Sequence, residues 1–239
     1  MFVNSRDAIA VATELRDATR HLAFGGDVAM VYHPLDYAWR VHQQWLERYG
    51  QGRKRVLLIG MNPGPFGMAQ TGIPFGAVNH VRDWMGLDAP IDQPGEMHPK
   101  RPITGWATTR IEVSGDRLWT WAAARFGTAE RFFAEFFVIN YCPLCFLGET
   151  GRNLTPDKLP AAEREPLQAI CDDALGAFVR VYQPEWVLGV GKFAANRIRA
   201  AITDDVRIGT VLHPSPASPA ANRGWAEAAE RQLQEQGVI

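Results

Sequence analysis

Residues 55–60 read RVLLIG and residues 61–72 continue MNPGPFGMAQTG, so a short apolar run passes directly into a loop rich in glycine and proline. Apolar runs without alternating polar residues are typical of strands that are covered on both faces. Three more such runs lie at 136–140, 186–190 and 207–212. The sequence therefore predicts a sheet of buried strands.

Helical spacing of apolar residues separates these runs, at 118–126, 165–182 and 193–202. Strands that alternate with helices predict an α/β fold, with a parallel sheet and helices on both of its sides. Ser218 followed by Pro219 is a helix start signal, and we expect that helix to continue to residue 236. The 239 residues contain no repeat and no obvious linker, so we expect one domain spanning residues 1–239.

The overall composition suits a folded protein and carries no basic signal. The apolar fraction is 46% and the formal net charge is −1, so any attraction to nucleic acid must come from local groups. No run approaches the roughly 20 apolar residues that cross a bilayer, and the N-terminus is too charged for a secretory signal. We therefore expect a soluble, intracellular protein with no membrane partner.

The three cysteines include the pair Cys142 and Cys145 in a CxxC spacing. A redox CxxC normally opens a helix, whose N-terminus lowers the pKa of the first thiol. The residues that follow, 146–156, read as a loop. Thiol oxidoreductase therefore ranks third among the functions considered, behind the two that are given below. With Cys171 distant, three cysteines cannot form a four-cysteine cluster by themselves, and we expect no metal site.

Polar side chains follow three of the expected strands. Asn62, Asn140 and His213 each stand at a strand end, and proline lies one or a few residues further on. A single asparagine there is most often a turn former, and a single histidine is most often structural. The carboxyl ends of parallel strands share one edge of a sheet, where ligands bind, so the three side chains together predict a site.

The prolines of the first loop argue against a phosphate cradle. Such a cradle directs successive backbone N–H groups at oxygen, and Pro63 and Pro65 have none. These motifs also lack the carboxylates of glycoside hydrolysis and the parts of a Ser-His-Asp triad. An amide can complement the edge of a base, donating to a carbonyl and accepting from a ring N–H. The pattern favours recognition of a nucleobase, with a histidine that stabilises developing negative charge.

Three segments carry a family resemblance: GMNPGPFGMAQTGIPFG at 60–76, NYCPL at 140–144 and HPSPASPAANRGW at 213–225. They closely resemble the signature segments of the single-strand-selective monofunctional uracil-DNA glycosylases, and HPKRP, EVSG and GRNLTP extend the match over most of the chain. The resemblance implies a three-layer α/β/α fold with a four-stranded parallel sheet. It also implies excision of uracil and 5-hydroxymethyluracil from single- and double-stranded DNA, as the first step of base excision repair, with no metal or cofactor.

The resemblance also assigns roles to residues. Asn62 would position the attacking water, and His213 would donate to O2 of the departing base. Asn140 would read the flipped base. The remaining residues of the base pocket would be Phe75, which stacks on the base, and Gly64 and Met68, which lie near C5.

The segment 213–225 would enter the DNA helix in place of the flipped nucleotide. Ala217 stands where animal members carry arginine, so we expect a smaller wedge and a stronger preference for single strands. The residues expected to contact phosphates are Lys192, Ser215, Ser218 and Arg223. The main alternative is a non-catalytic protein of the same fold that binds a nucleotide or nucleobase, which would not need the wedge. A monomer suits a scanning repair enzyme.

Overall fold

The computed structural model describes residues 5–239. Within these residues, seven strands form two sheets: β1 (Met30–Tyr32), β2 (Val56–Gly60), β3 (Phe136–Asn140), β4 (Cys145–Leu147), β5 (Asn153–Leu154), β6 (Trp186–Val190) and β7 (Arg207–Val211). The longer helices are α1 (Ser5–Thr19), α3 (Trp39–Tyr49), α5 (Val113–Phe126), α6 (Ala129–Glu135), α7 (Ala161–Tyr182), α8 (Lys192–Ala201) and α10 (Trp225–Glu235). The short helical turns are α2 (Pro34–Tyr37), α4 (Met68–Thr71), α9 (Pro219–Asn222), η1 (His80–Trp84), η2 (Gly105–Ala107) and η3 (Pro156–Lys158).

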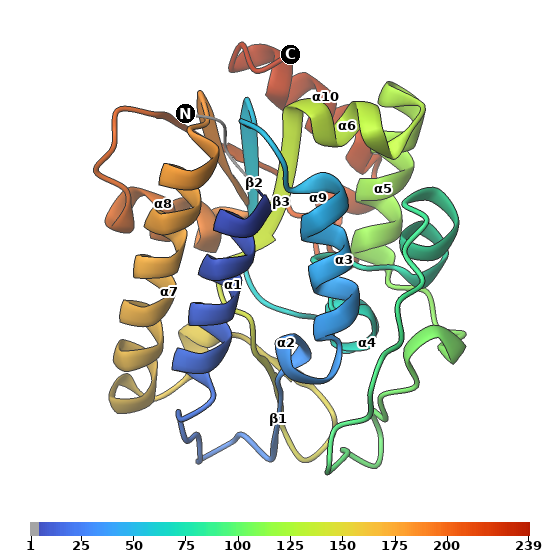
Figure 1. Ribbon diagram of the computed structural model, residues 1–239, viewed down its shortest axis with the longest axis vertical. Coiled ribbons are helices and arrows are strands. Elements are labelled where there is room, and N and C mark those ends of the chain that lie inside the picture. The colour runs from blue at the N-terminus through green and yellow to red at the C-terminus, as the bar shows by residue number, and fades with distance from the viewer. Residues whose placement is uncertain (1–4) are drawn as a thin grey trace.

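The larger sheet has the strand order β3-β2-β6-β7, and all its strands are parallel. Helices α1, α7 and α8 lie to one side of it, and α5, α6 and α10 to the other (Figure 1). Every residue of β2 and β6 is buried, because both faces are covered. The predicted three-layer fold with a four-stranded parallel sheet is confirmed.

The register of this sheet aligns the polar strand ends. Gly60 at the end of β2 pairs with Asn140 at the end of β3. The ladder continues beyond both strands, since the backbone N–H of Tyr141 donates to Gly60 O and that of Cys142 donates to Met61 O, each at 2.9 Å. The loop after β2 and the loop after β3 therefore leave the sheet side by side.

A second, small sheet was not predicted. Strands β1, β4 and β5 pair antiparallel in the order β1-β4-β5, so the expectation that residues 146–156 form only a loop is wrong. Strands of two or three residues are too short to show a period in sequence. The small sheet forms because β4 pairs with β1 on one side and with β5 on the other. Strand β1 lies more than 100 residues before β4 in the sequence, so no local pattern shows this pairing.

The predicted helix over residues 220–236 is also wrong in part, because it is broken in two. Helix α9 ends at Asn222 and α10 begins at Trp225. Gly224 between them has φ +122°, a conformation that glycine adopts at low cost and that lies outside the helical region. The break allows the loop after β7 and helix α10 to follow different directions.

No helix in the described part of the chain is long and apolar enough to cross a membrane.

Candidate active site

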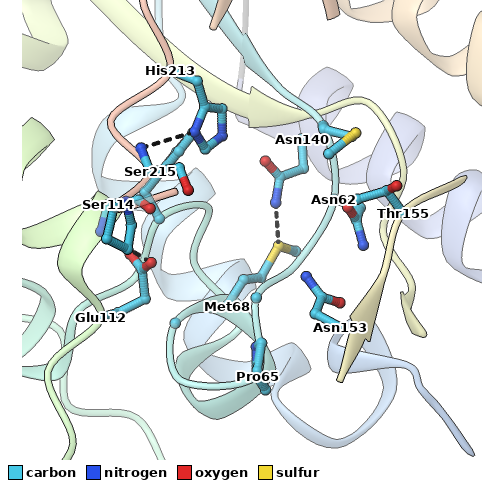
Figure 2. Close-up of a pocket in the computed structure, with 15 residues that line it drawn as sticks. Asn62, Pro65, Met68, Glu112, Ser114, Asn140, Asn153, Thr155, His213 and Ser215 are labelled. Carbon is cyan, nitrogen blue, oxygen red and sulfur yellow. Dashed lines mark hydrogen bonds between the residues drawn. The ribbon is translucent and has the colours of Figure 1, made fainter. Parts of the chain in front are cut away.

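A cavity of about 310 Å³ opens at the carboxyl ends of β2, β3 and β7 (Figure 2). This volume lies at the small end of the range for ligand sites, about 300–1,000 Å³. The lining residues are Met61, Asn62, Gly64, Pro65, Gly67, Met68, Phe75, Glu112, Ser114, Asn140, Asn153, Thr155, His213, Ser215 and Pro216.

Most of the side chains predicted from the sequence meet in this cavity. The predicted residues that line it are Asn62, Gly64, Met68, Phe75, Asn140, His213 and Ser215. Those that lie outside its lining are Lys192, Ala217, Ser218 and Arg223. Segments that are more than 150 residues apart in sequence thus come together at one edge of the sheet, as expected from the parallel topology.

His213 is held as a neutral donor. Its Nδ1 accepts the backbone N–H of Ser215 at 3.1 Å, so the proton of the neutral ring sits on Nε2. Burial lowers the pKa of His213 to about 4, because a charged imidazolium would lose its hydration there. In Figure 2 the other ring nitrogen lies on the side of Asn140. The site therefore contains an N–H donor that is uncharged at neutral pH.

Asn62 is oriented by backbone carbonyls. Its Nδ2 donates to Leu144 O at 3.3 Å and weakly to Pro63 O at 3.4 Å. Both amide donors are thereby directed at the protein, and Oδ1 remains as the acceptor on a side chain that lines the cavity. An amide oxygen can hold a water molecule but is too weak a base to remove its proton.

Asn140 makes a weak contact that a ligand can replace. Its Nδ2 donates to Met68 Sδ at 3.2 Å, and a thioether is a poor acceptor (Figure 2). Its Oδ1 lies tight against Gly60, where an added Cβ would sit only 2.2 Å away. The amide is therefore fixed in position, while its donor is available for exchange with a better acceptor.

Phe75 holds an uncommon backbone conformation. Its φ is +55°, which is costly for a bulky residue and persists only where the surroundings impose it. Trp119 Nε1 donates to its carbonyl at 2.9 Å, and Gly115 packs so closely that an added Cβ would lie 1.8 Å from that oxygen. The ring lies 5.9 Å from the His213 ring at an angle of 46°. The fold thus places an aromatic side chain in the wall of the cavity.

The predicted site omitted several lining residues: Met61, Pro65, Gly67, Glu112, Ser114, Asn153, Thr155 and Pro216. Glu112 is the N-cap of α5, and its carboxylate accepts the N–H groups of Ser114 and Gly115. Burial raises the pKa of Glu112, against the opposing effect of these two bonds. The segments EVSG and GRNLTP contain Glu112, Ser114, Asn153 and Thr155, but only tertiary structure shows which of their side chains face the cavity.

The loop after β7 is held from α5. Arg117 donates from Nη1 to Pro214 O and from Nη2 to Asn222 Oδ1, each at 2.9 Å. Asn222 in turn donates to Pro216 O at 2.8 Å. Ala217 is exposed at the tip of this loop, where its N–H donates to Ser215 Oγ at 3.1 Å. The loop is therefore braced at its base, while its tip faces solvent.

The other predicted phosphate contacts are peripheral. Ser218 is the N-cap of α9 and accepts the N–H of Ala221 at 3.4 Å. Lys192 is exposed at the first residue of α8, and Arg223 is exposed just after α9. These positions suit surface contacts but give no direct link to the cavity.

The cysteines do not form a redox site. Cys142 and Cys145 are both fully buried, and neither begins a helix. Burial raises the pKa of the Cys145 thiol, so it stays protonated and unreactive. Among the described residues, no three His, Cys, Asp or Glu side chains form a group that could hold a metal ion.

The fold and this constellation correspond to a known class of protein. The sequence profile of the uracil DNA glycosylase superfamily matches residues 47–234. The chain therefore belongs to the uracil DNA glycosylase superfamily. Within it, the chain is 49% identical over 221 residues to the single-strand selective monofunctional uracil DNA glycosylase of Mus musculus, which covers 91% of this chain and 79% of the relative.

Two further comparisons agree with this placement. The bovine protein of the same name is 47% identical over 228 residues, covering 94% of this chain and 84% of the relative. The crystal structure of wild-type Pedobacter heparinus SMUG2 superposes with a TM-score of 0.65 at 15% identity, covering 95% of this chain and 97% of that one. The structural likeness supports the fold, and the sequence matches confirm the family resemblance found in the motifs.

Proposed function

We propose that this protein is a monofunctional DNA glycosylase that hydrolyses the N-glycosidic bond of uracil in DNA. The observation that carries the proposal is the neutral His213, whose Nε2–H shares one cavity with the amides of Asn62 and Asn140. The sequence identity to glycosylases with this activity supports the same conclusion. A cavity at a sheet edge cannot reach a base inside a duplex, so the target nucleotide must be flipped out or unpaired.

Asn140 discriminates between bases. Its Nδ2 exchanges the Met68 sulfur for O4 of uracil, and its Oδ1 accepts N3–H. Cytosine presents the opposite pattern, with a donor on C4 and an acceptor at N3, and leaves buried polar groups unpaired at about 1–3 kcal/mol each. Phe75 stacks on the bound base, a contact worth about 1–3 kcal/mol.

The leaving group is stabilised more than the nucleophile is activated. As the bond from C1′ to N1 breaks, the electron pair departs with the base, and His213 donates to O2 of the resulting anion. A fixed donor of this kind contributes about 2.7–4 kcal/mol. Asn62 Oδ1 holds the water that adds to C1′. Because an amide is not a useful base, the proton of this water leaves late in the reaction.

Further properties belong to the same proposal. Gly64 presents no side chain near C5, and the thioether of Met68 is flexible, so the site admits 5-hydroxymethyluracil and related 5-substituted bases. The enzyme acts on single- and double-stranded DNA and initiates base excision repair. Its DNA contacts include Lys192, Ser215, Ala217, Ser218 and Arg223. The protein is an intracellular monomer, and residues 1–239 form one domain.

A single oligonucleotide assay tests the activity. A single-stranded DNA with one uracil is incubated with the protein, treated with alkali and sized on a gel. We expect strand breaks at the uracil position, and none in the matched strand that carries cytosine. Absence of a break at uracil and at every modified base tried would contradict the proposal and favour the binding protein without catalysis.

A further inference from the structure

Two large aliphatic side chains are exposed beside the cavity. Ile111 is 63% exposed and Val113 is 38% exposed, and they stand on either side of Glu112, which lines the cavity. Exposed apolar side chains at the edge of a ligand site offer a surface that a bound partner can cover. A partner that covers this pair extends outward from the cavity.

A cationic stack adjoins these side chains. Arg110 Cζ lies 4.4 Å from the centroid of the Phe66 ring, and Arg101 Cζ lies 5.2 Å from it. Phe66 itself stands between Pro65 and Gly67, which both line the cavity. The stack is therefore attached to the same rim as the exposed aliphatic pair.

Arg110 has hydrogen-bond donors to spare. It is exposed, and within residues 5–239 it forms neither a hydrogen bond nor an ion pair with a carboxylate. A guanidinium that stacks on a ring keeps the N–H groups at its edge free, in a planar fork that fits a phosphate. The ring fixes the plane of the guanidinium, so less side-chain freedom is lost when the phosphate binds.

Glu112, the acid closest to Arg110 in the sequence, forms no ion pair with it within residues 5–239. The Glu112 carboxylate already accepts the backbone N–H groups of Ser114 and Gly115. Lys100, which directly precedes Arg101, is exposed and forms no ion pair in the described part of the chain. The chain as a whole has a net charge of −1, so this cluster is a local excess of positive charge.

We propose that Arg101, Phe66, Arg110, Ile111 and Val113 form a strand-binding strip, which carries the unpaired nucleotides next to the excised base. Arg110 contacts a phosphate, and Arg101 adds a second positive charge next to the same Phe66 ring. Ile111 and Val113 pack against the face of the neighbouring base. A base in a duplex is already stacked, whereas a base in a single strand has a face to offer, so the strip favours single-stranded DNA. This inference rests on the proposed function, because it takes the cavity as the place of the excised base.

Binding is measured without cleavage, by fluorescence anisotropy of a labelled 15-nucleotide strand with a tetrahydrofuran abasic analogue, over a series of salt concentrations. Loss of one phosphate contact lowers the slope of log K against log salt by about 0.7 for a single strand. We expect this decrease in slope in Arg110→Gln and not in Arg110→Lys, which keeps the charge. The matched control is Arg199→Gln, an exposed arginine on α8 at the end far from Lys192.

The aliphatic pair is tested by strand preference. In Ile111→Ser/Val113→Ser we expect the ratio of single-strand to double-strand affinity to fall at least threefold, with an unchanged salt slope. Equal salt slopes for Arg110→Gln and Arg199→Gln, or an unchanged strand ratio in the serine variant, would overturn the strip. Uracil cleavage by the wild type is measured separately. A protein that shows the strip effects but cleaves no uracil would refute the glycosylase proposal and leave the strip standing.

Discussion

Replacement of Gly60 with alanine tests how closely the Asn140 amide is packed, and with it the proposed role of this amide in reading the base. Gly60 ends β2 and pairs with Asn140 across the sheet. An added Cβ would lie 2.2 Å from Asn140 Oδ1 and 2.8 Å from Phe75 Cε2. Non-bonded heavy atoms are most stable at about 3.5–4.0 Å, so the amide must move by roughly 1 Å and the ring must tilt.

The expected effect follows from the hydrogen bonds that the displaced amide loses. A buried polar group left without its partner costs about 1–3 kcal/mol. Because about 1.36 kcal/mol corresponds to a factor of ten, kcat/KM for uracil should fall about 5- to 150-fold. The free energy of unfolding should change less, since alanine restricts the unfolded chain by about 0.5–1 kcal/mol and offsets part of the strain.

Single-turnover cleavage of a uracil-containing single strand measures the effect, with urea unfolding in parallel. Gly95→Ala is the control, because a Cβ there meets no atom of the described residues within 4 Å. In the background of Asn140→Ala the clash with Oδ1 is gone, so the further change Gly60→Ala should cost less than it does in the wild type. A Gly60→Ala enzyme within twofold of the wild-type rate would refute this account of the packing.

Four further predictions concern the reaction and the wedge. Asn62→Ala and His213→Ala should each lose tenfold or more in single-turnover cleavage, about the contribution of one oriented group, and near-normal rates in both would contradict the assigned roles. Because the pKa of His213 is lowered to about 4, the ring stays neutral as the pH falls, and kcat/KM should not change between pH 8 and pH 5. A fall in kcat/KM near pH 6.5 that also occurs in Glu112→Gln would show that His213 titrates normally. Ala217→Arg should raise activity on U:G and U:A duplexes relative to single strands, and unchanged ratios would refute the wedge assignment. Arg117→Gln removes the two hydrogen bonds that hold the loop after β7, and we expect it to lower cleavage of duplex DNA at least threefold. Arg117→Lys should restore part of this activity, and equal duplex rates in the wild type and both variants would show that the two bonds are not needed.

The layered fold and the convergence of three polar side chains on one cavity could be predicted from the sequence for a physical reason. Buried parallel strands leave continuous apolar runs, and such a sheet collects the residues after its strands along one edge. The positions of Asn62, Asn140 and His213 at strand ends were therefore enough to predict a common site, and the structure brings all three to one cavity. The motifs that carry the resemblance then indicated the family, which the comparisons confirm.

Other properties depend on contacts between distant segments, which a linear pattern does not contain. The sequence shows that residue 213 is a histidine, but its tautomer follows from the Ser215 N–H and its neutrality from burial. Likewise Phe75 could be named from its motif, yet its positive φ is imposed by packing against Gly115 and the bond from Trp119. The pairing of β1 with β4 and the stack of Arg110 on Phe66 have no sequence period at all. The sequence by itself thus determined the class of fold, the strand ends and the family. The tertiary structure decided protonation, orientation and the shape of the rim, because burial and hydrogen-bond geometry exist only once distant segments have packed together.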